Sequence, residues 1–115
     1  MELRYPQRPG IPALDGISLR VLAGKKNAIC GTSGSGKTSI LAAIERFYDP
    51  SRGTIKFGDL DHREIPLQAL RASMAYVSQD PVLFQGTVRW NVSLGALNPE
   101  AVTQEQVRRA CEQAQ

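Results

Sequence analysis

Eight consecutive residues of this chain, 31–38, follow the pattern G-x-x-x-x-G-K-[ST], which is typical of a loop that binds phosphate groups. The residues of this P-loop are, in order, Gly31, Thr32, Ser33, Gly34, Ser35, Gly36, Lys37 and Thr38. The glycines allow successive backbone N–H groups to turn toward one anion without obstruction by a Cβ atom. The segment is therefore expected to bind a phosphorylated ligand.

Two side chains at the end of the P-loop suit a triphosphate that carries Mg²⁺. Lys37 can reach the β- and γ-phosphates as a mobile positive charge, and the Thr38 hydroxyl can coordinate the metal. The alternative is a plain glycine-serine turn between a strand and a helix. The flanking sequence favours binding, because a phosphate-binding loop connects a strand to the N-terminus of a helix.

The flanking segments predict this strand and this helix. Residues 28–30 form an apolar run that ends at Gly31, which indicates a buried strand, and residues 36–48 carry an apolar stripe with helical spacing. Further elements predicted from alternation and turn signals are strands at 17–21, 54–57 and 74–77 and a short helix at 66–73.

A helix is also predicted near the end of the sequence. Thr103 and Gln106 form a capping-box pair, and an apolar stripe with helical spacing follows them. The stripe consists of Val107, Ala110, Cys111 and Ala114. It continues without a glycine or proline stop, so we expect a chain interrupted within a domain, although a frayed terminal helix would have the same pattern.

Length and composition restrict the class of protein. The 115 residues correspond to one domain or less, and 42% hydrophobic with 22% charged residues is typical of a soluble globular chain. The longest apolar run, 40–44, is far shorter than the roughly 20 residues of a membrane-spanning helix. An acidic residue and a proline stand where a secretory signal needs an apolar core, so a cytoplasmic location is expected.

Charge and cysteine content exclude two kinds of site. The 14 basic and 11 acidic residues are spread along the chain and form no basic stripe, which argues against a nucleic-acid partner. Cys30 and Cys111 lack the spacing of a metal site and are expected to be reduced and buried.

Three motifs resemble the nucleotide-binding cassette of ABC transporters, in particular the multidrug and peptide exporters similar to P-glycoprotein. They are the P-loop, the run Glu-Arg-Phe-Tyr-Asp-Pro at 45–50 and the run Val-Ser-Gln-Asp-Pro-Val-Leu-Phe-Gln-Gly-Thr-Val at 77–88. The resemblance implies that residues 1–115 are part of an α/β ATP-binding domain. This part would hold a truncated P-loop NTPase core with N-terminal β-strands, and the start of a helical subdomain near residue 87.

The resemblance also implies roles for individual residues. Tyr5 matches the aromatic residue that stacks on adenine, and Ser39 adds to the nucleotide contacts of the P-loop. Gln79 matches the Q-loop glutamine, which contacts Mg²⁺ and the attacking water and senses the transmembrane domain. Lys37 and Gln79 would then be catalytic, and Thr38 and Gln79 would bind the metal. The alternatives are a Tyr5 packed in an edge strand and a Gln79 that is only a polar turn residue.

The stretch 81–90 would lie where a cassette meets the coupling helices of its membrane partner. Val82, Leu83 and Phe84 suit such a contact because they are consecutive apolar residues. A local core cluster is the alternative for the same three residues.

Several parts of an ABC cassette are not found in these 115 residues. They are a strand-end carboxylate followed by a catalytic glutamate, the Leu-Ser-Gly-Gly-Gln signature and the switch histidine. Asp80 fits the Q-loop pattern better than a strand end, and His62 is expected to lie in a solvated loop. In this family the γ-phosphate lies between the P-loop of one cassette and the signature of another, so a second cassette is an implied partner.

The expected function is the binding of ATP and Mg²⁺ by part of an ABC-transporter ATPase domain, on the cytosolic side of a membrane. In the parent family this domain couples ATP hydrolysis to export, together with a transmembrane domain. One alternative is a non-catalytic nucleotide-binding or assembly fragment. Another is a small P-loop kinase, which would need clamping and lid arginines that the scattered arginines here do not form.

Overall fold

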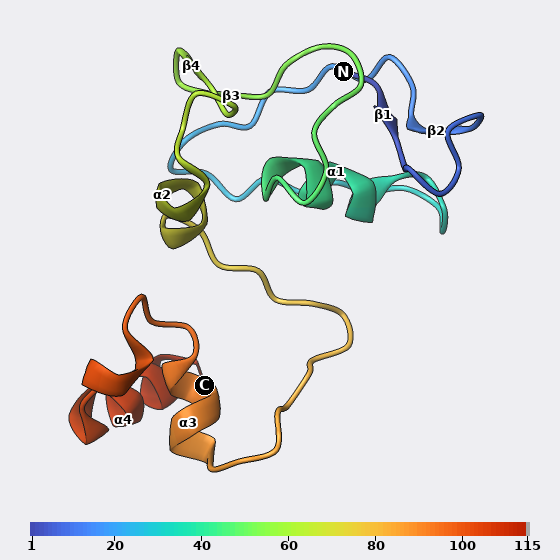
Figure 1. Ribbon diagram of the computed structural model, residues 1–115. Coiled ribbons are helices and arrows are strands. Elements are labelled where there is room, and N and C mark those ends of the chain that lie inside the picture. Colours follow the sequence, from blue (N-terminus) through green and yellow to red (C-terminus); the bar gives the residue numbers. More distant parts are fainter. Residues whose placement is uncertain (115) are drawn as a thin grey trace. The chain divides into compact units, whose positions relative to one another are not determined.

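The computed structural model describes residues 1–114 (Figure 1). The chain divides into two units, Met1–Met74 and Ala75–Gln115. The elements of the first unit are β1 (Leu3–Arg4), β2 (Pro12–Leu14), α1 (Lys37–Ile44), β3 (Lys56–Phe57), β4 (Leu60–Asp61) and α2 (Leu67–Ala72). Those of the second unit are α3 (Val88–Ser93), the 3₁₀ helix η1 (Pro99–Ala101) and α4 (Gln104–Gln113).

The core of the first unit joins a strand pair to the helix that follows the P-loop. β1 and β2 are antiparallel, with Leu3 opposite Leu14. These two leucines pack with Ile40 and Ala43 of α1, and all four side chains are buried. Burial of this apolar face holds α1 on the hairpin, so the sequence before the P-loop fixes the helix after it.

Helix α1 ends earlier than its apolar stripe predicts. Arg46 adopts a left-handed backbone with φ of 57°, and its N–H donates to the Ala43 carbonyl while Phe47 N–H donates to Ala42. These two hydrogen bonds form a Schellman motif, which satisfies the free carbonyls of a helix end. Phe47 therefore lies outside the helix and is 59% exposed, contrary to the expected helix over 36–48.

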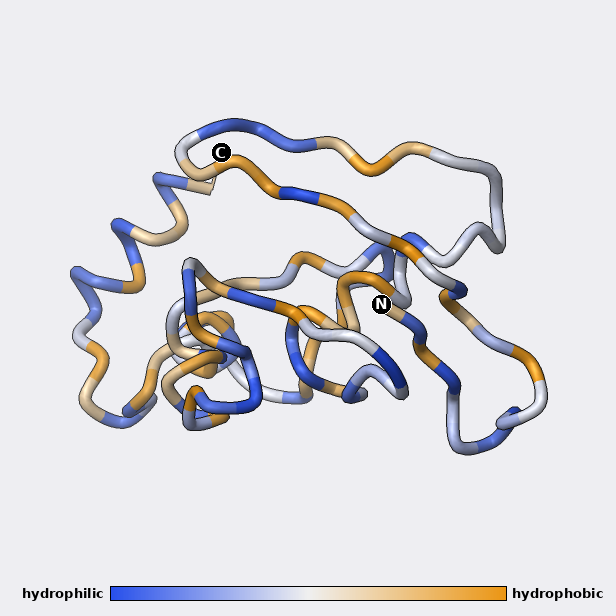
Figure 2. Tube along the Cα trace, turned by 90° about the horizontal axis from the view of Figure 1, so that it is seen from above, coloured by the Kyte–Doolittle hydropathy of each residue, from blue (hydrophilic) through white to orange (hydrophobic). Residues whose placement is uncertain are grey.

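Three predicted strands, at 17–21, 28–30 and 74–77, are wrong. None of these segments has regular structure, and the predicted strand at 54–57 is reduced to the two residues of β3, paired with β4. An isolated strand gains too little to offset its loss of conformational entropy, so apolar alternation forms a strand only beside a hydrogen-bonded neighbour. Hydrophobic residues accordingly lie on irregular segments as well as in helices (Figure 2).

The predicted short helix at 66–73 is confirmed as α2, and the capping box of α4 is confirmed as well. In α4 the Thr103 hydroxyl accepts from the Gln106 N–H at 3.3 Å, and Gln106 Oε1 accepts from the Thr103 N–H at 2.8 Å. Of the apolar stripe only Val107 is buried, and α4 packs against α3. Within residues 1–114 no helix is long and apolar enough to cross a bilayer.

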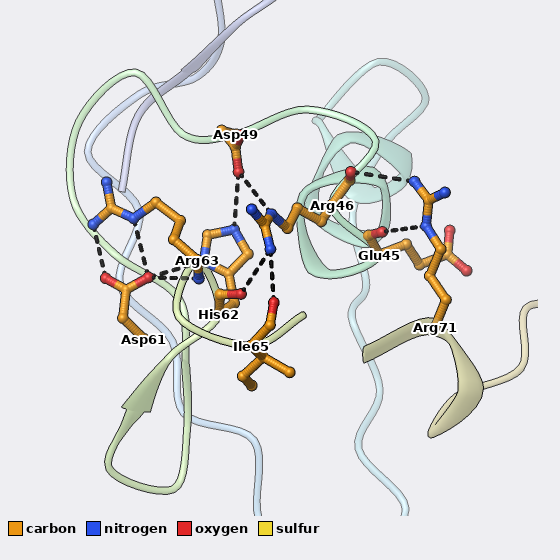
Figure 3. A network of polar contacts seen from close by, with 8 residues as sticks. All are labelled: Glu45, Arg46, Asp49, Asp61, His62, Arg63, Ile65 and Arg71. Atoms are coloured by element: carbon orange, nitrogen blue, oxygen red, sulfur yellow. Dashed lines mark hydrogen bonds and ion pairs between the residues drawn. The ribbon is translucent and has the colours of Figure 1, made fainter. Parts of the chain in front are cut away.

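A buried histidine holds the end of the β3–β4 hairpin near the end of α1 (Figure 3). The His62 side chain is completely buried, with Nδ1 at 3.2 Å from Asp61 Oδ1 and Nε2 at 3.4 Å from Asp49 Oδ1. The expectation of a solvated loop histidine is therefore wrong. Arg63 donates to Asp61 at 2.7 Å and holds the pKa of that carboxyl far below its usual range.

Arginines complete this connection to α1 (Figure 3). Arg46 Nη1 donates to the carbonyls of His62 and Ile65, at 3.2 and 2.9 Å. Arg71 of α2 donates to the carbonyl of Glu45 at 3.4 Å and lies over the Phe47 ring. Hydrogen bonds from charged donors to backbone carbonyls are among the stronger ones, so this network orients the C-terminal end of the P-loop helix.

Candidate functional site

A cavity of about 310 Å³ lies against the P-loop in the first unit. This volume is at the lower end of the range of small-molecule sites. Its lining residues are Tyr5, Arg8, Ile11, Pro12, Ala13, Gly34, Gly36, Lys37, Thr38 and Ser39. The structure thus brings Tyr5 together with five of the predicted P-loop and helix residues, although 29 positions separate Tyr5 from Gly34 in the sequence.

The P-loop curls around the ammonium group of Lys37. Lys37 Nζ donates to the carbonyls of Gly31 and Thr32, at 2.9 and 2.7 Å, and to Ser35 Oγ at 3.4 Å. A lysine carries three N–H donors, and these contacts use all of them. The positive charge is therefore held inside the loop, where an incoming phosphate would meet it.

Gly36 cannot carry a side chain in this structure. It is the N-cap of α1 with φ of 91°, and a Cβ there would lie 2.6 Å from Leu14 Cδ2 and 3.0 Å from the Ala13 carbonyl oxygen. The P-loop therefore passes close to β2, and glycine is required for both conformation and space. Gly34 also has a positive φ, of 78°, but open space surrounds its Cβ position.

We predict that Gly36→Ala lowers the free energy of unfolding by about 1–3 kcal/mol, because alanine would be strained at this φ and would collide with β2. Urea unfolding measures the change. Gly34→Ala tests strain alone, since nothing lies near its Cβ position, and Gly10→Ala has neither strain nor contact. Equal stability of the Gly36 and Gly10 variants would contradict the close packing described here.

Tyr5 directly follows β1, and its half-buried ring faces two different neighbours. Its hydroxyl lies 2.8 Å from Ser39 Oγ, and its ring packs edge-to-face on Tyr48 with centroids 4.8 Å apart. Ser39 itself is buried in the first turn of α1. Tyr5 also lines the cavity, so a packing role and contact with a ligand are both compatible with its position, and adenine stacking remains a prediction.

The cavity has the electrostatic character that an anion requires. Two of its ten lining residues, Arg8 and Lys37, are basic, and none is acidic. The N-terminus of α1 adds the positive end of its helix dipole. Sequence reasoning did not include Arg8 in the site; its only signal was a basic residue in the proline-rich loop that follows Tyr5.

Magnesium fits this site only together with a ligand. Residues 1–114 hold no cluster of three acidic, histidine or cysteine side chains that could bind a metal. Thr38 is exposed and lines the cavity, so its hydroxyl is available to a metal that phosphate oxygens also coordinate. Mg²⁺ commonly binds in this way, with few protein ligands and several from the substrate.

Gln79 is exposed and belongs to the second unit. The strand that was expected to position it, 74–77, is not formed, and Val77 is 91% exposed. Its pairing with Thr38 around a metal therefore remains a prediction. Asp80, next to it, is exposed as well, and its carbonyl accepts from the Ser78 hydroxyl at 2.8 Å.

The expected burial of the two cysteines is also wrong. Cys30 and Cys111 are exposed free thiols, because the strand expected to bury Cys30 is not formed and the α4 stripe is covered only at Val107. Exposure of 73%, 83% and 56% argues against a local core cluster, which was the alternative for Val82, Leu83 and Phe84.

A larger cavity, of about 890 Å³, lies elsewhere in the first unit. Residues 17–23 and 53–58 form most of its wall, and it contains no P-loop residue. It consists mainly of the irregular segments where strands were expected, so we do not assign it a ligand.

A glycine-rich loop that leads into a helix, with a lysine held over it, is typical of P-loop proteins. Residues 14–115 match the model of the family described as ABC transporter. The chain belongs to the ABC transporter family. This family implies a P-loop NTPase fold, and the mixed helices and strands of the structure are compatible with it.

Similar proteins are known transporters. The chain is 41% identical over 115 residues to "ABC multidrug transporter MDR1" of Cryptococcus neoformans, covering 99% of this chain and 8% of that protein. It is 44% identical over 110 residues to "Multidrug resistance protein pgp-1" of Caenorhabditis elegans, covering 96% of this chain and 8% of that protein. The "Sophorolipid transporter" of Starmerella bombicola is 43% identical over 115 residues, with 99% and 9% covered. The chain thus spans less than a tenth of the length of these relatives.

Proposed function

We propose that the chain binds ATP at the cavity beside the P-loop. The observation that carries this proposal is the convergence of Tyr5, Lys37 and Thr38 on one cavity that has two basic and no acidic lining residues. Backbone N–H groups of the P-loop and the N-terminus of α1 would bind the β- and γ-phosphates, and Lys37 would exchange its contacts with loop carbonyls for phosphate oxygens.

The remaining residues of the site would contact the magnesium ion or the adenine base. Thr38 would hold Mg²⁺ through its hydroxyl, with Gln79 as a second ligand, and the bound metal would neutralise charge on the β- and γ-phosphates. Tyr5 would stack on adenine, because an aromatic face offers favourable stacking to any base. Ser39, which also lines the cavity, would add to the nucleotide contacts of the P-loop.

We also propose that this chain is part of the ATPase domain of an ABC exporter, in which ATP hydrolysis drives transport across a membrane. The support is the family match over residues 14–115 and the transporter names of the relatives. The partners would be a transmembrane domain and a second cassette, and the domain would lie on the cytosolic side. The helical subdomain would begin at α3, whose N-cap is Thr87.

The exposed apolar residues before α3 suit the transmembrane partner. Val82, Leu83 and Phe84 are 73%, 83% and 56% exposed. Asn91 holds the end of this segment, because its amide accepts from the Phe84 N–H at 2.9 Å and donates to the Phe84 carbonyl at 3.0 Å. A short apolar segment fixed in this way offers a preformed contact surface.

The proposed adenine contact gives a direct test of the site. We expect Tyr5→Ala to weaken ATP binding by about 1–2 kcal/mol, about 5- to 30-fold, because a stacking surface is lost. Binding of inorganic tripolyphosphate should be unchanged. Isothermal titration calorimetry with both ligands, in the presence of Mg²⁺, measures the two effects.

Tyr76→Ala is the matched control, since Tyr76 is an exposed tyrosine of the other unit. It should bind both ligands like the parent chain. If Tyr5→Ala weakened the binding of ATP and of tripolyphosphate to the same extent, Tyr5 would support the conformation of the P-loop and would not stack on the base.

A further inference from the structure

The loop that connects β1 to β2, residues 5–11, forms part of the wall of the candidate site. Three of its residues, Tyr5, Arg8 and Ile11, line the cavity together with residues of the P-loop and of α1. The position of this β1–β2 loop therefore helps to set the shape of the cavity that a ligand would enter.

Prolines weaken the attachment of the β1–β2 loop to the strand before it. Arg4, the last residue of β1, lies opposite Pro12, the first residue of β2. A proline has no N–H group, so it cannot donate a ladder hydrogen bond at this position. Two further prolines interrupt the loop itself, and these are Pro6 and Pro9.

The backbone hydrogen bonds of the loop join loop residues to one another. The Arg8 N–H donates to the Tyr5 carbonyl at 2.9 Å, and the Ile11 N–H donates to the Arg8 carbonyl at 3.3 Å. These two turns bend the loop. Neither of them connects the outer part of the loop, around Pro9, to β1.

The side chain of Arg4 makes this connection. Its Nη1 donates to the Pro9 carbonyl at 3.0 Å, and its Nε donates to Glu2 Oε1 at 2.6 Å. A guanidinium holds its N–H groups in one plane, so the contact with Glu2 fixes the direction in which Nη1 points. Hydrogen bonds from a charged donor are among the stronger ones, and this one ties the loop to the strand.

We propose that Arg4 is a positioning residue, which attaches the β1–β2 loop to β1 through Pro9 and so preforms one wall of the cavity for ATP. This inference rests on the proposed binding of ATP. Arg4 does not line the cavity itself, so it acts through the loop and not by contact with the ligand. A wall that is fixed before the ligand arrives loses less conformational entropy on binding.

The test removes the donor and measures both binding and motion. We expect Arg4→Ala to weaken the binding of Mg-ATP about fivefold, the usual effect of one hydrogen bond, in isothermal titration calorimetry. Backbone NMR order parameters of the loop should fall, while those of α1 stay near the value of about 0.85 that is typical of a rigid backbone. The loop amides to follow are those of Gln7, Arg8, Gly10 and Ile11.

A second variant separates the hydrogen bond from the charge. Arg4→Lys keeps the positive charge but lacks the planar group that contacts Glu2 and Pro9 together. It should therefore weaken Mg-ATP binding and loosen the loop in the same way as Arg4→Ala. Thermal unfolding of each variant checks that it is folded, and Arg4→Lys tests the proposal on its own if Arg4→Ala does not fold.

Arg20→Ala is the matched control. Arg20 is an exposed arginine of the same unit and does not line the cavity, so its removal changes the net charge by the same amount. The control should bind Mg-ATP like the parent chain, and the order parameters of its β1–β2 loop should equal those of the parent.

Several results would overturn the inference. Parent-like ATP binding in both Arg4 variants would mean that the cavity does not need this attachment. Unchanged loop order parameters, or a fall in α1 as large as in the loop, would mean that Arg4 does not hold the loop specifically. Parent-like ATP binding in Arg4→Lys with a loosened loop would mean that the charge of residue 4 supports binding. A parent chain that bound no Mg-ATP would instead refute the proposed function, which separates the two failures.

Discussion

Lys37→Ala is expected to weaken the binding of Mg-ATP about 10- to 150-fold. A hydrogen bond between charged groups contributes about 1.5–3 kcal/mol, and the lysine ammonium is the positive group at the centre of the P-loop. The substitution would also remove the donor that draws the carbonyls of Gly31 and Thr32 together, so the loop itself would be less well ordered. Calorimetric titration with Mg-ATP measures the loss.

The response to tripolyphosphate distinguishes this effect from that of Tyr5. Because Lys37 acts on phosphate, tripolyphosphate binding should fall in parallel with ATP binding in Lys37→Ala, whereas Tyr5→Ala should affect ATP alone. Lys26→Ala is the control, since Lys26 is exposed just after a turn and does not line the cavity. A Lys37→Ala chain that bound both ligands like the parent would refute the site.

The sequence predicted best the features that depend on local interactions. The P-loop pattern and the start of the helix after it depend on glycines and on residues within one turn, and α1 begins at Lys37 within that pattern. The α4 capping box requires only Thr103 and Gln106, three residues apart. Such features form from neighbouring residues whatever the rest of the chain does.

Features that depend on distant partners were predicted poorly. Alternation at 17–21 and an apolar run at 28–30 are compatible with strands, but a strand exists only with a neighbour, and sequence periodicity does not identify the neighbour. The hairpin of β1 and β2 was missed as well. Its two strands have only two and three residues, and the sequence does not show that they pair. Cys30 was expected to be buried in one of the unformed strands and is exposed as a result.

The candidate site itself was partly predictable. Pattern alone identified the P-loop, and resemblance added Tyr5, which the structure places on the same cavity. The hydrogen bond between Tyr5 and Ser39 was not predictable, because it depends on how the hairpin packs on α1. His62 was misjudged since its polar sequence context suggested solvent, whereas two aspartates and the end of α1 surround it.

A polypeptide of these 115 residues is expected to hydrolyse ATP no faster than buffer does. Phosphoryl transfer is catalysed mainly by positioning and by stabilisation of charge in the transition state. The P-loop, Lys37 and Thr38 would bind the β- and γ-phosphates in the ground state. The sequence holds no signature motif and no strand-end carboxylate followed by glutamate, so nothing else is available to activate or orient the attacking water.

The structure removes one possible substitute for the missing groups. His62 is the single histidine, and its ring is fully buried between Asp49 and Asp61 at the far end of α1 from the P-loop, so it cannot act on a bound γ-phosphate. Asp80 is exposed in the second unit and is the remaining candidate. Asp80→Asn is therefore the informative variant.

Phosphate release should be measured over a series of protein concentrations, with Lys37→Ala as the reference for nucleotide-dependent turnover. In this family the γ-phosphate lies between the P-loop of one cassette and the signature of another, so self-association of a chain without a signature would leave each site incomplete. Release should therefore stay at the buffer rate at every concentration, while ATP still binds. Release that depended on Lys37 and disappeared in Asp80→Asn would identify Asp80 as the group that completes the site, and would make this segment an ATPase on its own.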